Sequence, residues 1–353
     1  MGAAPALTPE RLLRRLEWRV VRRLDGLLQG DYRSLFKGSG LDFTDLREYE
    51  PGDDLRHVEW NVTARLDEPW VREYVEDREV TAWLLLDASR SMGFGPADRN
   101  KDLVVAEVAT TLAHLLTRGG SRVGAVVVDA GVEAVVPPGS GRTQVLRIAG
   151  ALLARRAAHE TADAATPGLT VGAAGSATEG ATEGTTGATT ARGRRRRWRA
   201  PPRPRTAPPE PPGLTDLGAG LRALAGLARR RAVVVVVSDF VSTPGWDAEL
   251  GRLARRHDVV ALRVTDPREH DLPSVGTLYV EDPETGEQIV VDTDDAAFRA
   301  RVRQVADERR AELERVTRRA GADLHHVSTD EDLVRALVRV ATLRRKRIEV
   351  RRT

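Results

Sequence analysis

Short apolar runs alternate along the chain with longer stretches in which apolar residues recur every three or four positions. The short runs span residues 82–86, 122–128, 134–136, 232–237, 259–264 and 324–327. The longer, amphipathic stretches span residues 101–118, 143–157, 216–229, 247–257, 296–320 and 331–343. Strands that alternate with amphipathic helices are typical of a parallel sheet covered by helices. The pattern predicts an α/β fold with a doubly wound, mostly parallel sheet of the Rossmann-like type.

The residues before the first strand predict a separate N-terminal module, residues 1–79. Residues 9–28 have an apolar stripe at helical spacing, with Thr8 as a plausible N-cap. Residues 38–78 are polar and irregular, but too rich in aromatic and aliphatic side chains for a disordered linker. Arginines interrupt the first helix before any apolar stretch reaches the length of a signal peptide or membrane helix. We therefore expect no membrane anchor and a cytoplasmic protein.

The sheet domain is predicted to span residues 80–343 and to contain one insertion. Residues 158–213 are rich in Ala, Thr and Gly and then in Arg and Pro, a composition that predicts a disordered segment. Residues 277–281 and 288–291 predict a hairpin with a turn at residues 284–286. Residues 344–353 are predicted to form a basic tail.

Charge and cysteine content narrow the possible chemistry. The net charge is only +3, but residues 192–205 hold eight arginines and no acid, so the positive charge is local. The chain has no cysteine, which excludes disulfides, zinc-thiolate sites and thiol nucleophiles. A bound metal would need oxygen or histidine ligands.

Polar residues follow the first strand directly. Asp87, Ser89 and Ser91 form a D-x-S-x-S sequence after the apolar run 82–86. Open α/β sheets bind ligands at the carboxyl ends of their strands. The same residue types also cap helices and satisfy loop backbone, so this motif alone is a weak signal.

Two more pieces strengthen the signal. Thr215 lies where a helix is predicted to begin, and Asp239 comes shortly after the apolar run 232–237. Together with the first loop they offer three hydroxyls and two carboxylates, the hard oxygen ligands that Mg²⁺ takes, with Mn²⁺ and Ca²⁺ as alternatives. An ion with so little compensating charge attracts an external carboxylate.

This set resembles the metal ion-dependent adhesion site of the von Willebrand factor A family. The resemblance implies that Asp87, Ser89 and Ser91 supply the first loop, Thr215 the second and Asp239 the third. It also implies a protein that binds an acidic residue of a protein partner and catalyses nothing itself.

Residues 46–60, L-R-E-Y-E-P-G-D-D-L-R-H-V-E-W, followed by an Arg at 65 and V-R-E at 71–73, resemble the signature of the domain-of-unknown-function 58 family. Glu59 departs from that signature, in which aspartate is more usual, and Asn61 stands where lysine is common. The resemblance implies a MoxR-type AAA+ ATPase as partner, for which this chain would be an adaptor or substrate recruiter. We expect the polar and aromatic signature residues to form ion pairs and turns within the module or to dock a partner: Arg47, Asp53, Asp54, Arg56, Glu59, Trp60 and Arg65.

Two other functions remain open. One is a Mg²⁺-dependent phosphohydrolase with Asp87 as nucleophile, although such enzymes commonly need a second acid at the position that Ser89 occupies. The other is nucleic-acid binding through residues 192–205, where Trp198 among arginines is able to stack on a base; we consider it unlikely because arginine runs are often solvated linkers. No G-x-x-x-x-G-K-[ST] or G-x-S-x-G sequence is present, which argues against P-loop ATP hydrolysis and serine hydrolysis.

Overall fold

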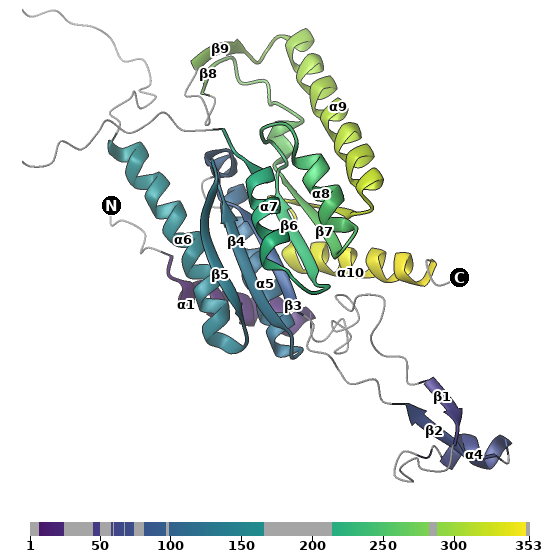
Figure 1. The fold of residues 1–353 in the computed structure, drawn as a ribbon. Helices are drawn as coiled ribbons and strands as arrows, with labels where there is room; N and C mark the ends of the chain where they lie inside the picture. The colour runs from purple at the N-terminus through teal and green to yellow at the C-terminus, as the bar shows by residue number, and fades with distance from the viewer. Residues whose placement is uncertain are drawn as a thin grey trace, which may run out of the picture.

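The structure, a computed structural model, describes residues 7–24, 45–49, 58, 60–66, 68–73, 81–96, 99–165, 214–281 and 288–350. At its centre is a six-stranded sheet in the order β10-β7-β6-β3-β4-β5 (Figure 1). All neighbouring strands are parallel except β5, which runs antiparallel to β4 at the edge. The strands are β3 (Thr81–Asp87), β4 (Arg122–Val128), β5 (Val132–Gly139), β6 (Val233–Ser238), β7 (Asp258–Thr265) and β10 (Asp323–Ser328). The predicted mixed α/β fold with a mostly parallel sheet is confirmed.

Helices cover both faces of this sheet (Figure 1). On one face, Leu84 and Leu86 belong to a core shared with α1, α5, α6 and α10. On the other, Trp83 and Leu85 pack with α7, α8 and the end of α9. Because both faces are buried, the central strands read as continuous apolar runs. These helices are α1 (Pro9–Leu16), α5 (Lys101–Arg118), α6 (Gly141–Ala165), α7 (Leu217–Leu227), α8 (Trp246–Ala254), α9 (Ala296–Ala320) and α10 (Leu333–Val350).

The predicted hairpin is present as a small separate sheet. Strand β8 (Thr277–Glu281) pairs antiparallel with β9 (Gln288–Asp292). The turn predicted at residues 284–286 lies outside the described residues. None of the helices in the described ranges is long and apolar enough to cross a membrane.

The sequence predicted a separate N-terminal module, residues 1–79. The N-terminal helix instead packs onto the sheet domain. Helix α1 and the π-helical turn η1 (Glu17–Val21) bury Leu12, Leu13 and Leu16 in the core formed with α5 and α6. An amphipathic helix needs an apolar surface to cover its stripe, and the sheet domain supplies it.

Part of the stretch predicted to be irregular has regular structure. Strand β1 (Asp45–Glu48) pairs antiparallel with β2 (Trp70–Glu73), and α4 (Trp60–Leu66) lies between them in sequence. Four-residue strands carry too few positions for a clear alternation of apolar and polar residues, which is why the pattern missed them.

The signature residues are only partly within the described ranges. Arg47 lies on β1, while Trp60 and Arg65 lie on α4 with exposed side chains. The remaining ones, Asp53, Asp54, Arg56 and Glu59, lie outside the described residues.

Two boundaries of the sheet domain are corrected by the helices. Helix α6 continues to Ala165, so residues 158–165 are helical, although composition assigned them to the disordered insertion. An ion pair between Arg156 and Glu160 at 3.0 Å and the contact of His159 with Asp129 at 3.1 Å stabilise this extra length. The rest of the predicted insertion, residues 166–213, lies outside the described residues.

The predicted basic tail is also largely helix. Helix α10 ends at Val350, and the side chain of Arg344 is buried against Asp258 rather than solvated. Arg347 pairs with Asp323 at 2.6 Å. These acidic partners on neighbouring strands turn a basic run into part of the domain.

Candidate functional site

The sheet register brings two of the predicted loops together. Strands β3 and β6 are parallel neighbours, with Leu86 opposite Val237. Asp87 ends β3, Ser238 ends β6, and Asp239 follows immediately. Both predicted carboxylates therefore lie at the carboxyl edge of the sheet, where open α/β sheets bind ligands.

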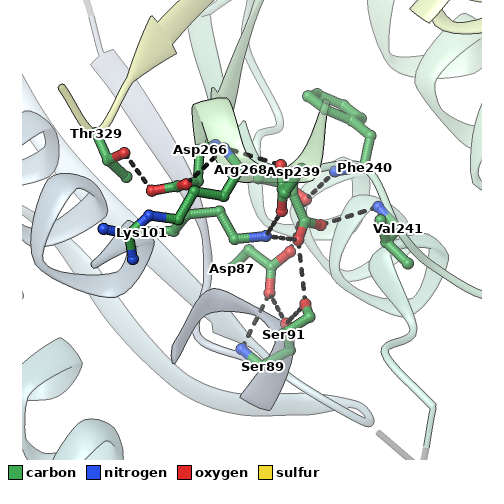
Figure 2. A network of polar contacts seen from close by, with 12 residues as sticks. Asp87, Ser89, Ser91, Lys101, Asp239, Phe240, Val241, Asp266, Arg268 and Thr329 are labelled. Atoms are coloured by element: carbon green, nitrogen blue, oxygen red, sulfur yellow. Dashed lines mark hydrogen bonds and ion pairs between the residues drawn. The ribbon is translucent and has the colours of Figure 1, made fainter. Parts of the chain in front are cut away.

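A continuous run of polar contacts joins these carboxylates (Figure 2). Asp87 Oδ1 accepts from the Ser89 hydroxyl at 2.6 Å and from its backbone N–H at 3.0 Å. The Ser89 and Ser91 hydroxyl oxygens are 3.0 Å apart, and Ser91 Oγ donates to Asp239 Oδ2 at 3.2 Å. All four side chains are buried. The structure thus brings together four of the five predicted metal ligands in one polar cluster.

The backbone after β6 aims Asp239 at this cluster. Phe240 has φ 62°, a left-handed conformation that is rare for a bulky residue. The Val241 N–H donates to Asp239 Oδ1 at 2.9 Å, and the Phe240 N–H donates to Ser238 Oγ at 2.8 Å. The Phe240 ring packs 5.4 Å from that of Trp246, which helps to hold the turn.

Thr215 lies in the loop that precedes α7 and is fully buried. Its carbonyl oxygen accepts from the Thr243 N–H and from the Ser242 hydroxyl, both at 2.9 Å. These hydrogen bonds hold Ser242 and Thr243, which follow Asp239, against Thr215. Helix α7, which follows, approaches the sheet closely at Gly220, where a Cβ would lie 2.3 Å from Val128 Cγ1.

The surroundings of Asp87 raise its pKa. Burial raises it, the nearby charge of Asp239 raises it further, and hydrogen bonds from Ser238 and Ser89 only partly oppose them, so the pKa reaches about 7. Two carboxylates this close and this buried are stabilised by any cation that reaches both.

Three residues of the cluster were not predicted from the sequence: Lys101, Ser238 and Glu269. Ser238 donates to Asp87 Oδ2 at 2.6 Å, so both oxygens of Asp87 accept from hydroxyls. Lys101 Nζ lies 2.7 Å from Asp239 Oδ2 and 2.5 Å from Glu269 Oε1. Burial lowers the pKa of Lys101, but Asp239 and Glu269 together raise it above its ordinary value, so the side chain is an ammonium.

Composition and placement offer a weak signal for Lys101. The chain has 55 Lys and Arg residues, of which only Lys37, Lys101 and Lys346 are lysine. Lys101 is the first residue of the helix that follows the D-x-S-x-S loop, where the helix dipole disfavours a cation. Such a placement asks for an acidic partner nearby.

A cavity of about 310 Å³ opens beside the first loop. Asp87 and Ser89 line it on one side, and Arg156 and His159 of α6 line it on the other. Asn100 also lines it, and among the described residues its buried Oδ1 has no hydrogen-bond partner. The cluster is therefore accessible to a polar group from outside the chain.

The donor set fits a hard cation. Within the described ranges, no group of three or more histidine or acidic side chains has a geometry that would hold a metal ion. A metal here would depend on Asp87 and Asp239 together with the hydroxyls, an all-oxygen set of the kind that Mg²⁺ prefers.

Fold and cluster together define an α/β protein with a polar site at the carboxyl edge of its parallel strands. The chain belongs to the family described as "Protein of unknown function DUF58", which matches residues 45–312. This confirms the family resemblance that the sequence signature predicted.

The chain is similar to mycobacterial relatives and, more distantly, to solved structures. The chain is 33% identical over 341 residues to an uncharacterised protein of Mycobacterium tuberculosis, covering 95% of this chain and 89% of that protein. An uncharacterised protein of Mycobacterium avium is 37% identical over 142 residues, 40% of this chain and 83% of the other. Among solved structures, the conserved hypothetical protein BatB of Bacteroides thetaiotaomicron is similar with a TM-score of 0.39 at 13% identity, over 76% of this chain and 99% of that one. An aerotolerance-related membrane protein of Bacteroides fragilis gives a TM-score of 0.36 at 15% identity over the same shares.

Proposed function

We propose that this chain is a Mg²⁺-dependent protein-binding module of the von Willebrand A type. Asp87, Ser89, Ser91, Thr215 and Asp239 would hold the ion. The observation that carries the proposal is the run of polar contacts from Asp87 through Ser89 and Ser91 to Asp239. It brings two distant loops of the sequence into one buried oxygen cluster.

The chemistry of these residues favours binding over catalysis. When bound, the ion would supply a Lewis-acidic position that a partner's carboxylate completes. Both oxygens of Asp87 already accept hydrogen bonds from the Ser89 and Ser238 hydroxyls, which fix the carboxylate and weaken it as a nucleophile. We therefore expect purified protein to show no metal-dependent phosphoesterase turnover. A rate that disappears in Ser89→Ala would favour the phosphohydrolase function instead.

The test of the metal site is calorimetric titration with Mg²⁺. Asp239→Asn should weaken binding by about tenfold or more, because it removes one of only two anionic ligands. Asp216→Asn is the matched control: it removes the same charge near Thr215, but its carboxylate caps α7 by accepting from the Ala219 N–H at 2.8 Å. If both variants bind Mg²⁺ like the wild type, the metal-site proposal is wrong.

We further propose a MoxR-type AAA+ ATPase as the partner, with this chain as an adaptor or substrate recruiter. The sequence has no P-loop of its own, so an ATP-driven step would need a second polypeptide. The experiment is affinity capture from the native host in Mg²⁺ and in EDTA, with Asp239→Asn as bait in a third arm. An ATPase captured equally in all three arms would contact another surface; none captured in any arm would contradict the partner proposal.

A further inference from the structure

Lys101 brings a cation of its own into the candidate metal site. Its ammonium is within 2.7 Å of Asp239 Oδ2, the same oxygen that accepts from the Ser91 hydroxyl (Figure 2). The lysine side chain is 2% exposed, so this contact is not a solvated surface pair. Asp239 is thereby neutralised from within the chain.

The identity of this residue matters as much as its position. The chain uses arginine at nearly every basic position but places a lysine here. An ammonium is a compact point charge, whereas a guanidinium is planar and larger. Of the two, the ammonium better substitutes for a small spherical cation among oxygen ligands.

Lys101 has a second carboxylate partner, Glu269. Glu269 Oε1 lies 2.5 Å from Nζ, and the Glu269 side chain is partly exposed, unlike that of Asp239. Glu269 ends the short helix η4 (Pro267–Glu269), whose capping box with Asp266 fixes it after β7. The ammonium thus lies between the buried carboxylate of Asp239 and the partly exposed carboxylate of Glu269.

We propose that Lys101 is a built-in competitor of the divalent ion: its ammonium neutralises Asp239 when no metal is bound, and metal binding displaces it from Asp239 and leaves Glu269 as its carboxylate partner. This inference rests on the proposed function, because it assigns the same oxygen cluster to Mg²⁺. It follows from Coulomb repulsion, since a divalent ion beside Asp239 and an ammonium on the same oxygen cannot both be stable at such short range. Mg²⁺ affinity is then set by the lysine as well as by the ligands.

The test is Mg²⁺ titration by calorimetry of four proteins: wild type, Lys101→Met, Glu269→Gln and Asp239→Asn. Lys101→Met keeps the side-chain length without the charge, and should bind Mg²⁺ about tenfold more tightly or better. Glu269→Gln removes this second carboxylate partner and should bind more weakly than the wild type. Arg122→Gln, an exposed cation at the amino end of β4, is the control for a general loss of positive charge and should change affinity little.

A double variant separates an effect through Lys101 from simple removal of negative charge. If Glu269 acts through the lysine, Glu269→Gln should weaken Mg²⁺ binding much less in the Lys101→Met background than in the wild type. An equal effect in both backgrounds would overturn the role given to Glu269.

The outcomes also separate this inference from the proposed function. Mg²⁺ binding that is present in the wild type, lost in Asp239→Asn and not tighter in Lys101→Met would overturn the competitor role and keep the metal site. Binding seen only in Lys101→Met would support the competitor role and contradict a metal-dependent wild type. No binding in any variant would overturn both. Because the chain has only three lysines, the ¹³Cε signal of Lys101 gives an independent readout, and a Mg²⁺-dependent shift of that signal is expected.

Discussion

Lys101 and Arg344 are the two Lys or Arg side chains that are buried in the described part of the chain, and their acidic partners lie at opposite ends of two neighbouring parallel strands, β6 and β7. Lys101 pairs with Asp239, just after the carboxyl end of β6. Arg344 pairs with Asp258, the first residue of β7. Both pairs remove charge from water, and both need a partner to make that tolerable.

Their surroundings differ in one respect that decides what each pair can do. Arg344 lines a small cavity together with apolar residues of α5 and α10, among them Leu112, Leu337 and Val340. Hydroxyls and a second carboxylate surround Lys101. In the proposed metal site a divalent cation that replaced the ammonium of Lys101 would find oxygen ligands, whereas the described residues that line the cavity with Arg344 are apolar. A buried ion pair is therefore structural or exchangeable according to the polar groups beside it.

The largest expected effect is a loss of protein stability when Arg344 is replaced. Arg344→Met should lower the free energy of unfolding by about 3–5 kcal/mol, because it leaves the largely buried Asp258 carboxylate without its partner. Urea unfolding measures it, and adding Mg²⁺ should restore none of the loss. Substantial rescue by Mg²⁺ would show that the amino end of the sheet also binds metal.

The second effect is a dependence of stability on pH, and it arises from His325, which lies near Arg344. Burial, reinforced by the charges of Arg344 and Arg347, lowers the pKa of His325 to about 4. The unfolded chain binds a proton near pH 6.5 and the folded chain does not, so stability falls as pH drops from 6.5 to 4 and is constant above that window. This one residue contributes about 3 kcal/mol at most over the whole range.

The measurement is urea unfolding at pH 7, 5.5 and 4.5. His325→Gln should flatten the dependence on pH, because the titrating group is gone. His270→Gln is the control, since His270 is exposed beside Asp307. An unchanged slope in His325→Gln would show that other groups carry the acid sensitivity.

The third effect distinguishes the lysine from the arginine directly. Lys101→Met should also destabilise the protein in EDTA, because Asp239 is then buried without its cation. Here Mg²⁺ should restore stability, by about 2.7 kcal/mol at one hundred times the dissociation constant. Melting temperatures of the wild type, Lys101→Met and Arg344→Met across a Mg²⁺ series test it. Equal responses of the two variants to Mg²⁺ would contradict the division into an exchangeable and a structural pair.

Sequence patterns located the central strands and most helices well, because burial on both faces leaves a strong apolar signal. Residues 122–128 and 296–320 match β4 and α9 at both ends. The C-terminal end of the domain was less predictable, because the sequence around Arg344 and Arg347 resembles a solvated basic run. In the structure these arginines pair with Asp258 of β7 and Asp323 of β10. Such pairing depends on tertiary neighbours that no local pattern contains.

The same limit applies to the candidate site. Asp87, Ser89, Ser91 and Asp239 were predicted because each follows a strand or lies in one recognisable motif. Lys101 reads locally as a solvated residue at the start of a helix. Its burial depends on Glu269, which lies 168 positions further along the chain and reaches it only through the fold. A motif therefore identified the ligands, and only the structure identified their counter-charge.

The smallest effect on stability is expected from residues 166–213, which lie outside the described residues and which composition predicts to be disordered. Replacing them by a Gly/Ser linker of about 20 residues should change the free energy of unfolding by less than about 1 kcal/mol, because loop-closure entropy grows only with the logarithm of length. Their eight arginines should matter for association instead, since the segment ends two residues before the candidate ligand Thr215 in the sequence. A cationic segment attracts an acidic partner over roughly a Debye length, about 8–10 Å at physiological salt, so the association rate of an acidic peptide should fall in the deletion variant at low salt and converge with the wild type at high salt. A second variant with the eight arginines changed to glutamine keeps the length and separates charge from chain connectivity.

Melting temperature, Mg²⁺ affinity and stopped-flow association rates test all three proteins. A collapse of the melting temperature in the deletion would mean that the segment is folded into the domain, and association rates that ignore both the arginines and the salt would leave those arginines without a role in partner binding.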